Sequence, residues 1–394
     1  MKLFSQKNDA LPYKFYYTPI LLLTIIGILD TTYLGFSHYK NYTDITFASF
    51  CALSNAINCD TVSQSPWSIF VGVPVALWGL AGYLLFFALL ISVRKQSNAT
   101  IALWSVLLVL GLIYSIAALV FAYISTVKIH AYCILCILSY LISFGLLFYS
   151  WIIWRRFGQG SFFTSFIRSF HIIFSLLRLR IFIIIFVILV LGLKTLIPHY
   201  WDYEVPFNSN MVQTGITGDG HPWIGAPKPE ITIEEFTDYQ CFQCYKMHFM
   251  LRKLITQFPD KIRLVHRHYP IDNEVNQHVA PQPFHVGSGR LALLAIAAGQ
   301  QGKFWQMNDL LYSELRNKRT TFDLKSFAEK TGTDFQQLVA DIQSQNTLKI
   351  LENDIKAGLR HKISGTPTYV IDDTVYEGSI PSEIIKKISA KDKE

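Results

Sequence analysis

Hydrophobic residues in the first half of the chain gather into five long runs that few polar residues interrupt. A helix needs roughly 17–25 mostly apolar residues to cross the hydrocarbon core of a bilayer. Each run is long enough, or nearly so, to form such a helix. The first run is too long for the apolar part of a cleaved signal peptide, and no small-residue cleavage site follows it. The five predicted spans are Tyr16–Ser37, Val71–Val93, Ile101–Ile124, Tyr132–Ile153 and Ile181–Ile197.

The pattern changes near residue 198, where prolines and glycines predict a linker over residues 198–226. Short apolar strands then alternate with segments of helical periodicity, which is typical of an α/β domain. The predicted strands are Ile231–Phe236, Ile262–His266 and Thr368–Ile371. The predicted helices are Cys244–Phe258, Leu291–Gly299, Phe304–Leu315, Asp323–Thr331 and Asp334–His361.

Charge is scarce and unevenly placed along the chain. Only 16% of the 394 residues are charged, against about 25% in ordinary soluble domains. Residues 1–200 carry 13 Lys and Arg but 4 Asp and Glu, and the basic residues lie beside the apolar runs. A nucleic-acid-binding protein would cluster them on a soluble face, so no nucleic-acid partner is expected. Basic flanks mark cytoplasmic segments. The sequence therefore predicts a cytoplasmic N-terminus and, after five spans, a second half outside the cytoplasm.

Two features of the first half have more than one interpretation. Segment Phe157–Arg180 mixes aromatic residues with single arginines, which predicts either an amphipathic helix at the membrane surface or a covered cytoplasmic loop. Asp30 lies inside the first span, where a carboxylate is costly and needs a partner or a wet cavity. Structural hydrogen bonding is the first interpretation of Asp30, and a part in proton uptake is the second.

All six cysteines fall into close pairs. In the predicted topology the three pairs share the non-cytoplasmic side, where disulfides form and persist. Two pairs have the spacing Cys-x-x-Cys, which closes a loop too short to stabilise much through chain entropy. Redox exchange and metal binding are the usual uses of that spacing. The pairs are Cys51/Cys59, Cys133/Cys136 and Cys241/Cys244.

Cys241-Phe-Gln-Cys244 follows a predicted strand and opens a predicted helix. The N-terminus of a helix stabilises a thiolate, which is the reactive species in disulfide exchange. A zinc site made of Cys241, Cys244 and His248 is the alternative. Structural zinc needs four ligands, however, and this half of the chain has no second cysteine pair. A cis peptide bond before Pro367 would leave a backbone edge exposed beside the thiols.

Four motifs of the second half are specific in combination. They are Glu235-Phe-Thr-Asp-Tyr-Gln-Cys241-x-x-Cys244, Arg267-His-Tyr-Pro270, Ala297-Ala-Gly-Gln-Gln-Gly-Lys-Phe-Trp305 and Gly365-Thr-Pro-Thr368. Through them, residues about 227–390 resemble the DsbA-like branch of the thioredoxin superfamily. The resemblance implies that Cys241 is the exposed nucleophile and Cys244 the buried resolving thiol. It also implies that Pro367 is the cis-proline of the peptide-binding edge and that Glu235 is the buried acid that accepts protons. Phe242-Gln243 departs from the more usual Pro-aromatic pair, and this dipeptide tunes the redox potential.

The other two cysteine pairs lie in the membrane half. Cys133 and Cys136 begin the fourth predicted span and share one helix face. That position suits a dithiol that meets a lipid-soluble partner, and simple buried packing is the alternative. Cys51 and Cys59 lie in the polar loop between the first two spans. They form either a static staple or a mobile shuttle, and exchange requires their Cα atoms to come within roughly 7 Å of each other.

The membrane half also carries an ordered set of motifs. They are Gly27-Ile-Leu-Asp-Thr-Thr-Tyr33-Leu, Cys51-x7-Cys59-x5-Ser65, Gly72-Val-Pro74 with Leu77-Trp-Gly79, and Cys133-x-x-Cys136-x3-Tyr140. Through them, Tyr16–Ile153 resembles the bacterial homologues of vitamin K epoxide reductase. The resemblance implies four helices around a quinone, with Cys136 the thiol nearest to it and Cys133 exchanging with the loop pair. Ser65 would lie on a short loop helix near the quinone, and Tyr140 would line the pocket. Which loop cysteine meets the outer domain stays open.

These interpretations predict an all-α membrane four-helix bundle like that of vitamin K epoxide reductase, a fifth transmembrane helix, and a soluble α/β domain with a DsbA-like thioredoxin fold. The quinone-binding bundle is expected over residues 1–156. Residues 157–226 would hold the interfacial segment, the fifth transmembrane helix and the linker. The thioredoxin-fold domain would cover residues 227–394.

The predicted function is the generation of disulfide bonds in extracytoplasmic proteins by a multi-pass protein of the bacterial inner membrane. Electrons would pass from reduced secreted or periplasmic substrate proteins through Cys241/Cys244, Cys51/Cys59 and Cys133/Cys136. The expected acceptor is ubiquinone or menaquinone from the membrane pool, and no metal is required. One alternative is a thiol-driven reductase of quinone or quinone epoxide. Another, of a different class, is a membrane chaperone for metals or peptides.

Overall fold

The chain folds into two compact units in the computed structural model, which describes residues 11–52, 57–97, 100–201, 212–316 and 323–389. The helical unit consists of Met1–Tyr39, Cys51–Ser63 and Trp67–His199, and the sheet unit of Lys40–Phe50, Gln64–Pro66 and Tyr200–Glu394. The basic tail at residues 1–10 and residues 202–211 of the predicted linker lie outside the described residues.

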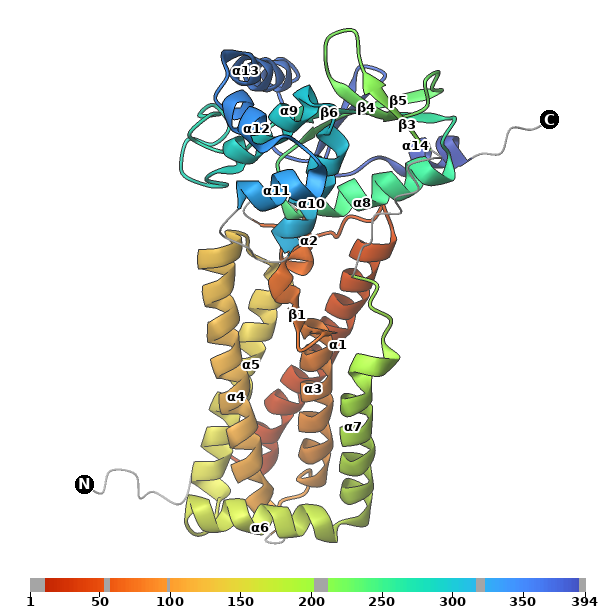
Figure 1. Cartoon of the computed structure of the whole chain (residues 1–394). Helices are drawn as coiled ribbons and strands as arrows, with labels where there is room; N and C mark the ends of the chain where they lie inside the picture. Colours follow the sequence, from red (N-terminus) through yellow and green to blue (C-terminus); the bar gives the residue numbers. More distant parts are fainter. Residues whose placement is uncertain (1–10, 53–56, 98–99, 202–211, 317–322, 390–394) are drawn as a thin grey trace, which may run out of the picture. The chain divides into compact units, whose positions relative to one another are not determined.

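Long apolar helices run side by side in the helical unit (Figure 1). Within the described residues, four helices are long and apolar enough to cross a membrane. The pair α6 and α7, bent by 92°, makes a fifth span if the two helices are counted together. The predicted apolar four-helix bundle is therefore confirmed, and the fifth predicted span, Ile181–Ile197, corresponds to α7 in the bent pair. The helices of this half are α1 (Tyr13–Thr43), α2 (Cys59–Gln64), η1 (Pro66–Ser68), α3 (Val75–Ser92), η2 (Ile101–Leu103), α4 (Trp104–Ile124), η3 (Ser125–Ile129), α5 (Ile134–Phe157), α6 (Phe162–Ser175) and α7 (Leu177–Leu196).

Close packing in the bundle depends on small residues where helices approach each other. A Cβ atom on Gly111 of α4 would lie 2.9 Å from the Cα atom of Leu147 in α5, so only glycine allows this approach. The interior below is filled by fully buried side chains that include Phe86, Trp104 and Leu146. The short strands β1 (Ile69–Phe70) and β2 (Val73–Pro74) form a hairpin just before α3.

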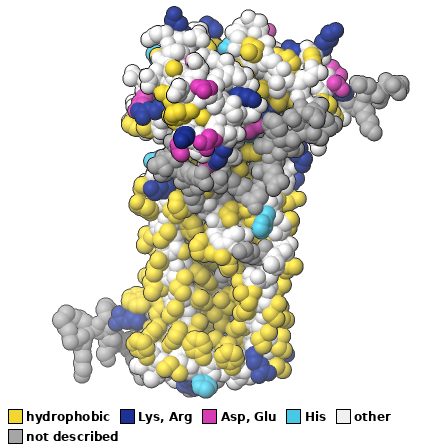
Figure 2. Space-filling model, viewed as in Figure 1, with side chains coloured by type: hydrophobic (Ala, Val, Ile, Leu, Met, Phe, Trp, Pro, Cys, Tyr) yellow, Lys and Arg dark blue, Asp and Glu magenta, His cyan; other side chains and the backbone are white. Residues whose placement is uncertain are grey.

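Large hydrophobic side chains cover most of the lateral surface of the bundle seen in Figure 2. Helix α6 has an unusual distribution of side chains, because Ser165 and Ser169 are buried whereas three of its phenylalanine rings are exposed. The Ser169 hydroxyl donates to the carbonyl oxygen of Ala102 at 2.7 Å. Phe163 is 76% exposed and Phe174 is 58% exposed. The segment at Phe157–Arg180 is thus largely helical, and its place at a membrane surface stays a prediction.

The sheet unit contains a six-stranded sheet with strand order β3-β4-β6-β5-β7-β8. Strands β5 and β6 pair in parallel, and the other neighbours pair antiparallel. The three predicted strands are confirmed as β5, β6 and β7. Part of the predicted linker is also strand, because β3 and β4 form a hairpin that extends the sheet through pairing of β4 with β6. The strands are β3 (Gln213–Ile216), β4 (Pro222–Gly225), β5 (Ile231–Thr237), β6 (Ile262–His268), β7 (Thr368–Ile371) and β8 (Thr374–Glu377).

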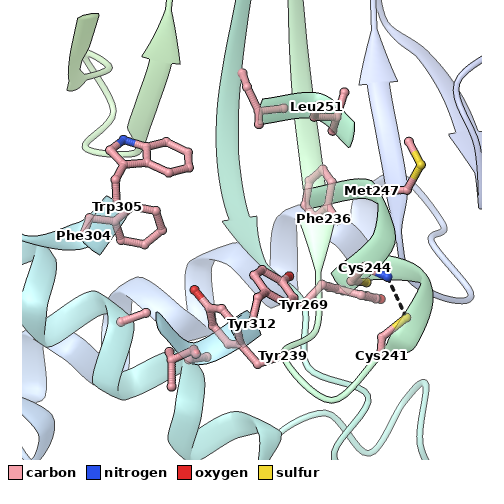
Figure 3. Packing of buried hydrophobic residues seen from close by; sticks show 14 of the residues in the cluster. Phe236, Tyr239, Cys241, Cys244, Met247, Leu251, Tyr269, Phe304, Trp305 and Tyr312 are labelled. Atoms are coloured by element: carbon pink, nitrogen blue, oxygen red, sulfur yellow. Dashed lines mark hydrogen bonds between the residues drawn. The ribbon is translucent and has the colours of Figure 1, made fainter. Parts of the chain in front are cut away.

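Helices surround this sheet and bury an aromatic core against it (Figure 3). The single helix predicted over Asp334–His361 is two helices. The first ends at Ile342, and Ser344 caps the second by accepting a hydrogen bond from the Thr347 N–H. Phe236, Tyr269 and Tyr312 are fully buried in the core. The helices are α8 (Phe242–Gln257), α9 (Ser288–Gln300), α10 (Phe304–Arg316), α11 (Leu324–Thr331), α12 (Phe335–Ile342), α13 (Gln345–Arg360) and α14 (Ser382–Ser389).

Candidate active site

Cys241 and Cys244 lie at the start of α8, immediately after the turn that follows β5. Cys241 is the N-cap residue, and its sulfur accepts a hydrogen bond from the backbone N–H of Cys244 at 3.3 Å (Figure 3). Cys241, expected to be exposed, is in fact largely buried at 8% exposure, and Cys244 is 1% exposed. The Cys241 thiol also donates to the carbonyl oxygen of Thr366 at 3.3 Å. The predicted cis peptide bond between Thr366 and Pro367 is present, so β7 begins directly beside the thiols.

The two thiols differ electrostatically. Burial raises the pKa of Cys241, but the hydrogen bond with Cys244 and the charge of His285 lower it by more, so the net pKa lies below that of an ordinary thiol. Burial and the interaction with Cys241 hold the pKa of Cys244 well above its ordinary value. Cys241 is therefore the thiol that ionises first, as a nucleophile requires.

Glu235 lies on β5 with its side chain fully enclosed. Its Oε1 atom is 2.9 Å from Nδ1 of His266 on β6. Burial raises the pKa of this carboxyl to about 7, and the positive charges of His248 and Arg252 offset only part of that effect. A carboxyl that changes charge near neutral pH can accept and return a proton under physiological conditions.

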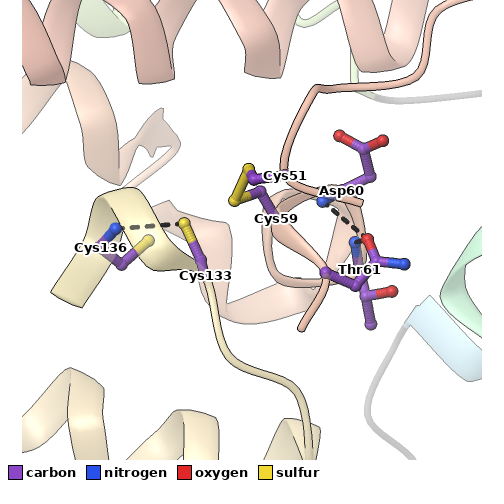
Figure 4. The surroundings of a disulfide bond; sticks show 7 residues. Cys51, Cys59, Asp60, Thr61, Cys133 and Cys136 are labelled. Atoms are coloured by element: carbon purple, nitrogen blue, oxygen red, sulfur yellow. Dashed lines mark hydrogen bonds between the residues drawn. A yellow bond between two sulfur atoms is a disulfide. The ribbon is translucent and has the colours of Figure 1, made fainter. Parts of the chain in front are cut away.

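The loop disulfide and the membrane dithiol belong to one buried cluster in the helical unit. A disulfide joins Cys51 to Cys59, with their Cα atoms 5.6 Å apart. Both residues pack with Cys133, and Cys136 packs against this cluster (Figure 4). The backbone N–H of Asn58, next to Cys59, donates to the carbonyl oxygen of Tyr132, next to Cys133, at 2.9 Å. This bond holds the loop disulfide beside the start of α5. The fold thus brings four of the predicted redox residues together.

Cys133 repeats at α5 the arrangement that Cys241 has at α8. Cys133 is the N-cap of α5, and its sulfur accepts from the backbone N–H of Cys136 at 3.2 Å. Both Cys-x-x-Cys pairs therefore present their first sulfur at a helix N-terminus, where the partial positive charge favours a thiolate. Cys133, Cys136, Cys241 and Cys244 carry free thiols.

Polar groups follow Cys136 along α5 into the bundle. Ser139, one turn further on, donates a hydrogen bond to Oδ2 of Asp30 from α1. Oδ1 of Asp30 is buried and has no hydrogen-bond partner among the described residues. Tyr140 lies half-buried on the same helix, and Ser65 is buried just after α2. The predicted hydrogen bonding of Asp30 is confirmed, and its Oδ1 atom has no partner among the described residues.

Two further groups of the sheet unit bear on the site: the ligands of the alternative zinc site, and a pair that sequence reasoning missed. His248, the third ligand of the alternative zinc site, lies with Nε2 2.9 Å from Oδ1 of Asp309. Within the described ranges, no group of three or more His, Cys, Asp and Glu side chains could hold a metal ion. Sequence reasoning missed Asp238 and His285, whose side chains meet 3.0 Å apart beside the Cys241 turn. His285 follows Cys241 by 44 positions, so only a tertiary contact reveals it.

Comparison with known families fits this combination of an apolar bundle and a thioredoxin-like sheet. The vitamin K epoxide reductase family matches residues 18–151, and the DSBA-like thioredoxin domain matches residues 232–388. The chain therefore joins a domain of the vitamin K epoxide reductase family to a DsbA-like thioredoxin domain.

Curated relatives match part of the chain. The Na(+)/H(+) antiporter NhaA 1 of Salinispora arenicola is 28% identical over 161 residues, which is 41% of this chain and 23% of that protein. The Na(+)/H(+) antiporter NhaA 3 of Salinispora tropica is 26% identical over 154 residues, which is 39% of this chain and 22% of that protein. The chain thus spans less than a quarter of the length of these two relatives.

Solved structures resemble a similar share of the chain. A thioredoxin-like oxidoreductase from Silicibacter pomeroyi is 24% identical, with 43% of this chain and 90% of that chain covered and a TM-score of 0.35. The thiol-disulfide exchange protein alpha-DsbA2 from Wolbachia pipientis is 18% identical, with 43% and 86% covered and a TM-score of 0.35. The catalytic domain of Proteus mirabilis ScsC is 23% identical, with 43% and 86% covered and a TM-score of 0.31.

Proposed function

We propose that this protein is a membrane thiol–disulfide oxidoreductase that makes disulfide bonds in proteins outside the cytoplasm and delivers the electrons to a quinone. The packing of the Cys51–Cys59 disulfide against Cys133 is the observation that carries the proposal. A disulfide buried beside a free Cys-x-x-Cys pair is poorly suited to be a mere staple, because exchange between the two pairs needs only a small displacement.

The proposed relay is a series of exchanges that each move two electrons. A reduced substrate protein converts the Cys241–Cys244 disulfide to two thiols and leaves with a disulfide of its own. The reduced pair then opens the Cys51–Cys59 disulfide, and the loop thiols in turn reduce Cys133–Cys136. The direction follows from the reduction potentials, since a difference of about 30 mV is worth about 1.4 kcal/mol for two electrons.

The residues beyond Cys136 fit a quinone. The buried oxygen Oδ1 of Asp30 can accept a hydrogen bond from a quinol hydroxyl or hold the proton that such a hydroxyl needs. Ser139 fixes the other oxygen of Asp30, and Tyr140 adds a ring on the same helix. When bound, a ubiquinone or menaquinone accepts the two electrons and two protons that the Cys133–Cys136 dithiol releases.

The setting of this activity follows from the spans and their charges. Basic residues flank the cytoplasmic ends of the spans in the proposed topology. With five spans, this topology would put the DsbA-like domain in the periplasm of a bacterium whose inner membrane holds the bundle. Reduced secreted or periplasmic proteins are the substrates. Sodium–proton exchange is not part of the proposal, because the antiporter relatives are matched over less than a quarter of their length.

The decisive experiment measures quinol formation by membranes supplied with a reduced substrate protein, compared across the wild type and the six single-cysteine variants. Cys241→Ser should stop oxidation of the protein substrate but leave quinone reduction by a small dithiol largely intact. Cys136→Ala should stop quinone reduction from either donor. Continued quinol formation in the Cys136 variant would contradict the proposal.

Reduction of a quinone epoxide is a second candidate, because the matched family is described by that reaction. The same thiols would serve both reactions. Supplying the reduced protein with a quinone epoxide and with the quinone in parallel separates them. A turnover rate higher with the epoxide would make epoxide reduction the better description.

A further inference from the structure

His285 lies beside the active-site turn although it comes from the segment between β6 and α9. Its Nδ1 atom is 3.0 Å from Oδ2 of Asp238, three residues before Cys241. The His285 side chain is 20% exposed, whereas that of Asp238 is fully buried. The imidazole therefore has one edge on a buried carboxylate and another toward solvent.

Asp238 is a rigid support for this imidazole. Its Oδ1 atom accepts from the backbone N–H of Gln240 at 2.6 Å, and its Oδ2 atom accepts from the backbone N–H of Ile271 at 2.7 Å. The Ser288 hydroxyl also donates to Oδ2, at 2.9 Å. These bonds and the charge of His285 outweigh the cost of burial and hold the pKa of Asp238 below its ordinary value. The carboxylate is thus favoured over the protonated acid at neutral pH.

A second contact holds the His285 segment to the turn of Cys241. The Gln240 side chain donates through Nε2 to the carbonyl oxygen of Val286 at 2.9 Å. His285 and Cys241 are consequently close enough to act on each other electrostatically. The two residues between the cysteines, Phe242 and Gln243, carry no charge, so the cation beside this thiol comes from another part of the chain.

We propose that the His285–Asp238 pair supplies the positive charge that stabilises the Cys241 thiolate, and so sets how strongly this site oxidises substrate proteins. The inference rests on the proposed function and names a positioning pair for it. The substrate's first thiolate attacks the Cys241 sulfur, the Cys241–Cys244 bond breaks, and Cys244 leaves and takes up a proton. The substrate's second thiolate then attacks the substrate sulfur of the mixed disulfide. Cys241 leaves as a thiolate, and an imidazolium beside it favours that departure.

The charges around His285 determine the pH range of this effect. Burial lowers its pKa, but Asp238, the Cys241 thiolate and Asp272 raise it more, so the net pKa lies above the ordinary value. Asp238 precedes Cys241, and Asp272, which follows β6, accepts from the backbone N–H groups of Gly287 and Gly289 close to His285. The imidazolium is thus present below its raised pKa, and its support of the thiolate is lost as the pH rises through that value.

The test is the pH dependence of iodoacetamide alkylation at Cys241 in the reduced full-length protein, with each cysteine followed by mass spectrometry. His285→Gln removes the charge and should move the alkylation midpoint to higher pH by about one unit. His285→Lys restores a charge and should move it back. His278→Gln, an exposed histidine of the same segment, is the matched control and should not move it.

A second measurement is the equilibrium of the Cys241–Cys244 pair with glutathione. His285→Gln should favour the disulfide form by about tenfold, and His285→Lys should reverse that change. An unchanged midpoint in His285→Gln, or an equal shift in the Gln and Lys variants, would overturn the proposal. Neither measurement uses a quinone or turnover, so both remain interpretable even if the proposed electron relay proves wrong.

Discussion

At the scale of single residues, the redox sites depend on a few buried groups whose charge differs from their charge in water. Glu235 is the clearest case, because its enclosed carboxyl titrates near pH 7. Tyr312 and Tyr369 each interact electrostatically with both Glu235 and Cys244. The acid and the resolving thiol therefore share one region of the core.

Glu235→Gln tests the acid as a proton acceptor. Cys244 must lose a proton when the pair closes to a disulfide, and the Glu235 carboxylate is available above about pH 7. The closure rate of the wild type should therefore rise as the pH passes 7, and the Gln variant should be at least about tenfold slower there. Rapid-mixing oxidation by a small disulfide measures this rate. Glu234→Gln changes the adjacent strand residue and should keep the rise near pH 7.

Asp30→Asn tests the polar end of the membrane site. The variant keeps the shape and the contact with Ser139 but loses the carboxylate. Quinol formation should fall by about tenfold or more, because proton transfer at the site loses its carrier. Exchange among the Cys51, Cys59 and Cys133 sulfurs should continue, as thiol trapping would show. Full quinone reduction in the variant would restrict Asp30 to a structural role.

The sequence was informative about residues whose chemistry is local and uninformative about residues that act across the fold. The hydrophobic pattern around the cysteines placed Cys133 and Cys241 at helix starts, and both are N-caps. His285 has no local signal, because its partner Asp238 is 47 positions away in the chain. Asp30 was expected to find a partner, but the chain could not say that Ser139 would be that partner.

At the scale of elements, hydrophobic periodicity located the long helices and the buried strands, because both bury a continuous face. It missed the hairpin β3–β4, whose strands are short and rich in glycine and belong to the sheet only through pairing with β6. It also joined α12 to α13, because the apolar spacing continues through the polar turn that Ser344 caps. The elements that were missed are those fixed by tertiary contacts or by a single cap.

Gly111→Ala tests the packing of α4 on α5. The added Cβ atom would meet backbone atoms of Leu147, which cannot rotate away. We expect a loss of about 1–3 kcal/mol of stability, measured as a lower midpoint of thermal unfolding in detergent. Gly35→Ala is the matched control, because its Cβ atom meets the end of the Leu77 side chain at 3.4 Å. Equal midpoints for the two variants would show that the helices separate easily.

At the scale of the whole molecule, the proposed relay needs every cysteine pair on one side of the membrane. The two family matches and the apolar helices establish a membrane domain and a thioredoxin-like domain. The side on which the second domain lies is a proposal from the charge pattern.

Labelling of introduced cysteines tests this orientation. In a variant without the six native cysteines, Lys356→Cys on α13 should react with a membrane-impermeant maleimide added to intact spheroplasts. Arg94→Cys, on the exposed segment after α3, should react only after the membrane is opened. Labelling in the reverse order would place the DsbA-like domain in the cytoplasm and remove the basis for protein oxidation.

Helix α6 buries Ser165 and Ser169 and exposes the rings of Phe163, Phe170 and Phe174, which is the reverse of what a helix on the surface of a protein in water does. The Ser169 hydroxyl donates to the carbonyl oxygen of Ala102, whereas the described residues leave Phe163 and Phe174 exposed. If α6 lies at the membrane surface as predicted, lipid, or the detergent that replaces it, completes the fold at this end of the bundle. Without lipid or detergent, the exposed rings of α6 would promote aggregation of the protein.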